Sequence, residues 1–207
     1  MIAHPRTLPG KLYLLSYDPE KGRISGRLNL ELLLGAAALT ELFQRGLLRD
    51  VKGKAIATGP APADLVPLLA QLLAEIAESR PRSWKYWVAR RRGLVRTLPQ
   101  ALAATGVLRV EQYRVLGLFP ATRVEPRDPR PRKALTAAFA TALRGPLSRV
   151  EPADAALVAL ADAAQLRVVL TFGQRREHRE RIRQLAAHCG PVPAALRAAI
   201  RDRNSEG

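Results

Sequence analysis

The chain has 207 residues, 47% of them hydrophobic and 25% charged, with a formal net charge of +16 at pH 7. The length favours one domain with a sizeable core over two domains, and the single cysteine, Cys189, excludes an internal disulfide. A charge this positive usually serves an anionic partner, either nucleic acid or a membrane surface; the alternative is a solvated, arginine-rich exterior.

The N-terminal segment does not have the pattern of a signal peptide. The longest charge-free hydrophobic segment near the start, Leu32–Thr40, is far shorter than the roughly 18 residues that a membrane-spanning helix needs. If a membrane is involved, we therefore expect the protein to lie on it.

In chain order, Lys11–Tyr17 is β-prone and predicts a hairpin together with an extended piece at Arg23–Leu28. Asn29 can cap a helix from Leu30 to about Arg45 that is apolar on almost every face, so it is expected to be buried. Two short strands follow around Gly53.

The middle of the chain predicts a helix from Asp64 to about Ser79 and another from Trp84, interrupted at Gly93 and continuing to Gly106. Val107–Val110 and Tyr113–Phe119 are strand-like. The proline-rich Pro120–Arg132 is expected to be an irregular loop.

The last third predicts helices at Pro131–Leu143, Glu151–Ala164, Gly173–His188 and Pro191–Arg201, and a strand at Leu166–Phe172. The predicted fold class is mainly α. We expect a single globular domain, residues 1–201, built on a buried central helix with surrounding amphipathic helices and short β-hairpins. Residues 202–207 are expected to form a disordered tail.

Motifs for catalysis are missing from the sequence. There is no zinc-binding C-x-x-C or H-E-x-x-H, no complete phosphate loop and no G-x-S-x-G. Glu31 and Glu41 lie ten residues apart on one predicted helix, so they are not expected to share a face or a task as a catalytic pair. We therefore expect no enzyme activity, no metal and no cofactor.

The positive charge is concentrated in one quarter of the sequence. Between Arg80 and Lys133 there are fourteen Lys or Arg and three acids, a formal +11. Trp84 and Trp87 precede Arg92 and Arg96 there, so interfacial aromatic rings and a phosphate-binding arginine pair could share a helix. Core packing is the alternative for both tryptophans.

Leu118 and Phe119 are expected near the tip of a hairpin that leads into Arg123, Arg127, Arg130 and Arg132. An apolar tip ringed by cations is typical of a two-signal membrane anchor. Packing of these two side chains on the helices is an equal alternative.

Several segments resemble the shorter bacterial members of the Golgi phosphoprotein 3 family. They are KLYLLSYDPEKGR at 11–23, LLGAAALTELFQRGLL at 33–48, GLVRTLPQALAATGVL at 93–108, RVLGLFPATRVEPRDP at 114–129 and ALVALADAAQL at 156–166. The resemblance implies a mainly helical domain, peripheral membrane association, and a basic pocket for phosphatidylinositol 4-phosphate beside an inserting hairpin.

The family's arginine pair falls at Arg92 and, with a one-residue shift, at Arg96. Gly26, with Arg27 alongside, stands where the family has a headgroup-contacting tryptophan, and Gly35 replaces a family arginine. The predicted headgroup-binding residues are Arg27, Arg91, Arg92 and Arg96, and the predicted inserting residues are Leu118 and Phe119.

The leading hypothesis is a cytoplasmic, non-enzymatic protein, peripheral on membranes, that binds anionic phospholipid headgroups and could serve as an adaptor for protein cargo. The runner-up is a DNA-binding protein, because Leu39–Gly59 has the element order of a winged helix. Residues 1–78 carry nine bases and eight acids, so that segment is not where the charge lies.

Overall fold

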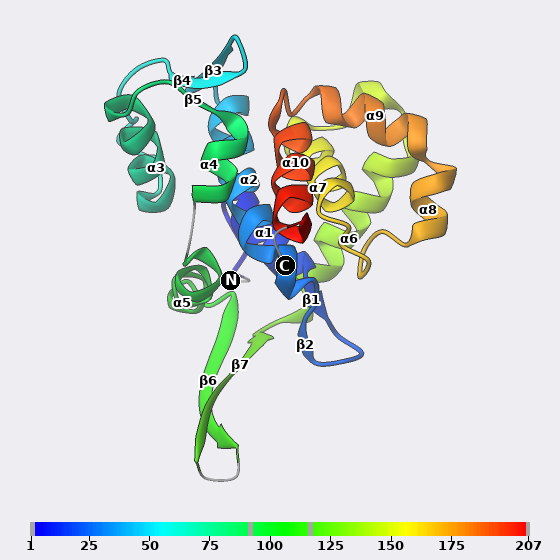
Figure 1. The fold of residues 1–207 in the computed structure, drawn as a ribbon. Helices are drawn as coiled ribbons and strands as arrows, with labels where there is room; N and C mark the ends of the chain where they lie inside the picture. Colours follow the sequence, from blue (N-terminus) through cyan, green and yellow to red (C-terminus); the bar gives the residue numbers. More distant parts are fainter. Residues whose placement is uncertain (1–2, 91–92, 116–117, 206–207) are drawn as a thin grey trace.

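The computed structural model describes residues 3–90, 93–115 and 118–205 (Figure 1). Its first half comprises α1 (Leu8–Leu15), β1 (Tyr17–Asp18), β2 (Arg23–Ile24), α2 (Arg27–Gln44), β3 (Leu48–Val51), β4 (Lys54–Ala57), α3 (Pro67–Glu78), β5 (Arg82–Ser83), α4 (Trp84–Arg90) and α5 (Leu94–Ala104). The second half comprises β6 (Leu108–Val115), β7 (Phe119–Pro126), α6 (Pro129–Arg144), the 3₁₀ turn η1 (Leu147–Arg149), α7 (Pro152–Ala163), α8 (Phe172–Glu177), α9 (Arg179–Ala187) and α10 (Val192–Ser205). The predicted class, a mainly helical single domain with short antiparallel hairpins, is confirmed.

Helix α2 runs through the centre of the fold (Figure 1) and packs against α1, α4, α7 and α10. Twelve of its residues are buried, which confirms the prediction from its apolar faces. It begins at Arg27 and not at Leu30, because Gly26 takes the N-cap position with φ of 68°. Asn29 lies inside the first turn, where its Nδ2 donates to the Ala164 carbonyl (3.2 Å).

The prediction of a strand at Lys11–Tyr17 is wrong, because most of this segment belongs to helix α1. Thr7 caps the helix by accepting from the Gly10 amide (3.2 Å), and all but one of its eight residues are buried. Packing against α2 overrides the β-propensity of the sequence. The hairpin survives only as a short ladder in which Tyr17 pairs with Ile24.

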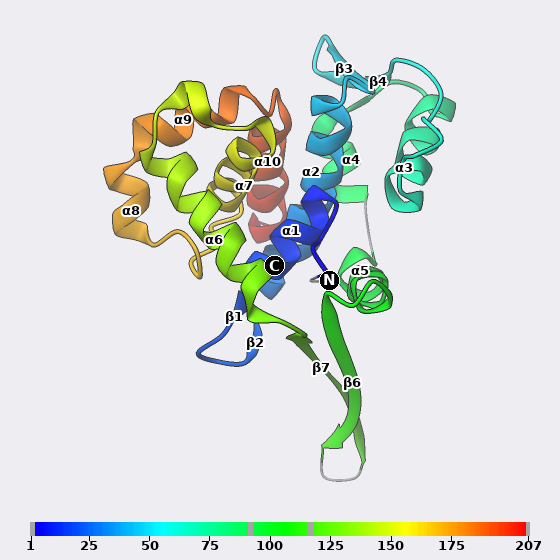
Figure 2. The same cartoon turned by 180° about the vertical axis from the view of Figure 1, so that it is seen from behind.

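Strands β6 and β7 form a long antiparallel ribbon that projects from the helical body (Figure 2). The ribbon lies on the same side of the molecule as the β1–β2 turn, whereas β3 and β4 lie at the opposite end of α2 (Figure 1). The prediction of an irregular loop at Pro120–Arg132 is wrong, since β7 extends to Pro126 and α6 begins at Pro129. A two-stranded ribbon tolerates prolines because each strand has an unpaired edge.

Two further predictions near the C-terminus are wrong. Leu166–Phe172 is not a strand: Leu166 and Leu170 are buried, and the segment turns from α7 to α8 after Gln165, whose φ is 56°. The expected disordered tail is helical through Ser205, because Arg203 donates to the Leu28 carbonyl and to Asn29 Oδ1 and so ties α10 to α2.

Candidate functional site: a basic cleft at the start of helix α2

An open cleft of about 1360 Å³ lies where the first turns of α2 and α5 meet β2 and the β6–β7 ribbon. Its lining includes the basic residues Lys21, Arg23, Arg27, Arg96 and Arg123, the acids Glu31 and Glu111, and the polar residues Tyr13, Gln100, Tyr113 and Thr122. The five bases and two acids give the lining a formal charge of +3. The cleft is therefore suited to an anionic ligand.

The bases of the cleft differ in how far the protein already neutralises them. Arg123 pairs with Glu125 (Nε to Oε1, 2.6 Å), and Lys21 lies 3.6 Å from Asp18. Among the described residues, no carboxylate lies within ion-pairing distance of Arg23, Arg27 or Arg96. These three guanidinium groups are therefore the ones most available to a ligand phosphate, which an arginine can bind through two parallel hydrogen bonds.

Glu31 fixes the two arginine-bearing helices relative to each other. It lies on α2, and its carboxylate accepts from the amides of Leu94 (2.5 Å) and Val95 (3.1 Å) at the start of α5. The N-cap residue of α5 is Gly93, whose φ is 88° and which offers no side chain for capping. A carboxylate from another helix thus replaces the missing cap. Its negative charge also interacts favourably with the positive end of the α5 dipole.

Tyr13 lies under the cleft and is only 2% exposed. Burial raises the pKa of its phenol to about 12, while the positive charge of Arg27 opposes that rise. Tyr13 therefore adds no charge to the cleft at neutral pH, and the charge of the cleft comes from the exposed bases and the acids of its lining.

Two of the predicted headgroup-binding residues meet in this cleft. Arg27 and Arg96 both line it and are both exposed. Arg91 and Arg92 lie outside the described residues. The exposed fraction of Leu118, in the turn of the ribbon, is 77%, so it does not pack on the helices; the side chain of Phe119 lies outside the described part of the chain.

Both tryptophans are core residues, each 2% exposed. Trp84 Nε1 donates to Asp50 Oδ1 (2.6 Å), and its ring packs edge-on against Phe43. The hypothesis that they form an interfacial surface with Arg92 and Arg96 is therefore wrong, because their rings complete the packing around the far end of α2.

Gly26 and Gly35 stand where the family has a tryptophan and an arginine, and the structure shows why glycine suits both positions. Gly26 needs its left-handed backbone to start α2, and a Cβ there would lie 3.2 Å from Leu166 Cδ1. A tryptophan at this position would be strained. Gly35 is buried inside α2, in the core rather than on the cleft rim.

Of the described bases between Arg80 and Lys133, only Arg96 and Arg123 line the cleft, and several others are engaged elsewhere in the protein. Lys85 pairs with Asp202 (2.7 Å), Arg130 pairs with Asp128 (2.6 Å), and Arg82 stacks on the Tyr86 ring of α4. The expected ring of cations around the ribbon tip is also wrong. Arg123 lies in the middle of β7, opposite Glu111, and Arg132 donates from Nε to the Tyr17 carbonyl at the base.

Sequence reasoning missed Lys21 and Arg23 as cleft residues. Lys21 lies in the tight turn between β1 and β2, in which Asp18 accepts from the amides of Glu20 and Lys21, and Arg23 begins β2. The turn signal in DPEKGR was visible, but the contact between β2 and β7 joins segments about a hundred residues apart.

The described residues contain neither a metal-binding cluster nor a membrane-spanning helix. Within residues 3–90, 93–115 and 118–205, no three His, Cys, Asp or Glu side chains gather in a way that could hold a metal ion. None of the helices in those ranges is long and apolar enough to span a bilayer.

The chain is thus a mainly helical domain with a two-stranded ribbon beside an arginine-lined cleft. The chain matches the Golgi phosphoprotein 3 (GPP34) family over residues 8–203, and it therefore belongs to that family. The family consists of non-catalytic, lipid-binding adaptors, peripheral on membranes, that in general bind phosphatidylinositol 4-phosphate at Golgi membranes. A search of the curated proteins returned no match.

Proposed function

We propose that this chain is a peripheral membrane protein that binds an anionic phospholipid headgroup, phosphatidylinositol 4-phosphate or a related phosphorylated lipid, in the cleft lined by Arg27 and Arg96. The observation that carries the proposal is the presence of three guanidinium groups, those of Arg23, Arg27 and Arg96, without a carboxylate partner among the described residues, on the rim of one cleft. Arg91 and Arg92, which lie outside the described residues, remain predicted headgroup-binding residues on the grounds of sequence alone.

The β6–β7 ribbon adds a hydrophobic contribution to membrane attachment, besides headgroup binding in the cleft. Leu118 in its turn is largely exposed, and the ribbon projects from the same side of the molecule as the β1–β2 turn (Figure 1). Insertion of Leu118 and Phe119 would anchor the protein weakly, and each Lys or Arg near an anionic surface would add about 1 kcal/mol. Together these contributions favour reversible docking from the cytoplasmic side, which suits an adaptor that carries protein cargo.

A winged-helix role in DNA binding has less support. The segment with that element order consists of the end of α2 and the hairpin β3–β4, and Arg45 there pairs with Glu41 (2.7 Å). The cleft arginines lie at the other end of α2. DNA binding therefore serves as an alternative outcome of the experiment below.

The proposal is tested by sedimentation with neutral vesicles, vesicles containing phosphatidylserine, and vesicles containing phosphatidylinositol 4-phosphate. We expect pelleting with the anionic vesicles, strongest with the phosphorylated lipid, and release by salt. Equal binding to neutral and anionic vesicles would refute the proposal. Salt-dependent binding to duplex DNA without binding to any vesicle would favour the alternative.

A further inference from the structure

Leu28 is an exposed apolar side chain in an unusual place. Its exposed fraction of 86% is the highest among the large hydrophobic residues in the described part of the chain. It lies in the first turn of α2, where the neighbouring Leu30 is buried at 1% exposure. The central helix of the fold thus presents one leucine to the outside at its very start.

This leucine adjoins the basic cleft. The preceding residue, Arg27, lines the cleft, and Gly26 and Arg27 also line a smaller depression of about 280 Å³ with Lys21 and Arg23. Leu28 lines neither hollow, as expected for a residue one position further around the helix. It therefore projects beside the rim and not into the cleft.

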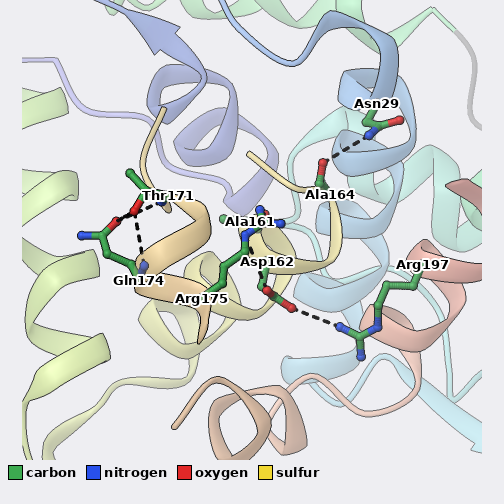
Figure 3. Close-up of polar contacts among 8 residues, drawn as sticks. All are labelled: Asn29, Ala161, Asp162, Ala164, Thr171, Gln174, Arg175 and Arg197. Carbon is green, nitrogen blue, oxygen red and sulfur yellow. Dashed lines mark hydrogen bonds and ion pairs between the residues drawn. The ribbon is translucent and has the colours of Figure 1, made fainter. Parts of the chain in front are cut away.

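The backbone that carries Leu28 is held by two other helices. Arg203 of α10 donates to the Leu28 carbonyl and to Asn29 Oδ1, and Asn29 donates to the Ala164 carbonyl at the end of α7. Figure 3 shows Asn29 reaching Ala164, next to the ion pair of Asp162 with Arg197. Because the turn is already ordered, contact of Leu28 with a partner would lose little backbone entropy.

The surroundings of Leu28 fit a lipid bilayer better than a protein partner. Arg27 precedes it on the cleft rim, and the guanidinium group of Arg203 contacts its carbonyl. A stable protein interface needs roughly 800 Å² per partner with an apolar centre. A single aliphatic side chain among cations instead matches the boundary between anionic headgroups and acyl chains.

We infer that Leu28 inserts into the bilayer beside the cleft, so that the cleft binds a phosphate carried by a membrane lipid in preference to the same phosphate in solution. The inference rests on the proposed function and assigns a contact separate from the ribbon tip. Leu28 would set the depth at which Arg27 meets the headgroup.

The test compares Leu28→Ser with Val51→Ser in sedimentation with phosphatidylcholine vesicles containing phosphatidylserine. Val51 is the matched control, because it is an exposed apolar residue (39%) on β3, at the opposite end of α2 (Figure 1). We expect Leu28→Ser to weaken vesicle binding on the order of tenfold. Val51→Ser should leave it unchanged, and neither variant should alter the weak binding of inorganic phosphate.

A Leu28→Trp variant gives a direct readout of insertion. Its added fluorescence should shift to shorter wavelength with anionic vesicles and be quenched by brominated acyl chains, while Val51→Trp should show neither change. Equal vesicle binding by wild type and Leu28→Ser, or added fluorescence in Leu28→Trp that vesicles do not change, would overturn the inference and leave the proposed function standing. A wild-type protein that does not bind anionic vesicles would overturn both.

Discussion

Glu31 and Glu41, ten residues apart on α2, do the same work in different surroundings. Glu41 accepts from the Leu8 amide (2.7 Å) at the start of α1 and pairs with Arg45, and it is 8% exposed. Glu31 accepts from the two amides at the start of α5, but it does so on the wall of the open cleft. The same kind of cap therefore completes the core at one position and organises a ligand site at the other. Helix α2 therefore carries both a carboxylate that stabilises the core and one that shapes the cleft.

The largest effect on stability is expected at the core cap. Glu41→Ala should lower the free energy of unfolding by about 2–3 kcal/mol, because it leaves the buried Leu8 amide without its acceptor and removes the partner of Arg45. Denaturant unfolding measures the loss. Vesicle binding by the folded variant should be unchanged, and a loss of binding would show that the core end of α2 also affects the cleft.

A smaller loss is expected at the cleft cap. Glu31→Ala should lower the free energy of unfolding by about 1 kcal/mol, the usual value of an N-cap. Amide hydrogen exchange should become faster at Leu94 and Val95 but stay unchanged in α1. Uniform acceleration in both helices would contradict the separate roles of the two carboxylates.

The buried Cys189 thiol should make the free energy of unfolding depend on alkaline pH. Burial raises the pKa of the Cys189 thiol from 9.0 to about 12, so the unfolded chain loses this proton first and stability declines as pH rises from 9 towards 12. At pH 10 the thiol should account for about 1 kcal/mol of that decline. Unfolding at pH 8 and pH 10 should show a smaller decline for Cys189→Ala than for wild type; identical declines would exclude the thiol as a cause.

The smallest effect on stability is expected at the ribbon tip. Leu118→Ser should leave the melting temperature unchanged, because the side chain is largely exposed. It should weaken binding to anionic vesicles on the order of tenfold, as expected for Leu28→Ser, since the same kind of apolar contact with the acyl chains is lost. Sedimentation provides the measurement, and unchanged binding would show that the tip does not insert.

The sequence was most informative where its pattern was local. The apolar faces of α2 predicted a buried helix, and α3 lies within the helix predicted from Asp64 to about Ser79, because burial follows helical periodicity in both. Local signals failed where tertiary contacts decide the structure. The β-prone segment at Lys11–Tyr17 became α1 through packing on α2, and the prolines of β7 were accommodated at a ribbon edge.

The site was predictable in part. Arg27 and Arg96 were expected to bind the headgroup, and both line the cleft. The role of Glu31 could not be seen, because it depends on a contact between residues 63 positions apart in the chain. For the same reason, no local pattern indicated that Lys21 and Arg23 would join the cleft while other bases of the middle quarter would lie elsewhere.

The most direct test of the cleft is the affinity of the double variant Arg27→Ala with Arg96→Ala for vesicles containing phosphatidylinositol 4-phosphate. The matched control is Arg176→Ala with Arg201→Ala, which removes the same charge from positions on α8 and α10 that do not line the cleft. We predict that the cleft variant binds at least about tenfold more weakly than the control, which should stay close to wild type. Equal affinities of the two double variants would contradict a headgroup site in this cleft.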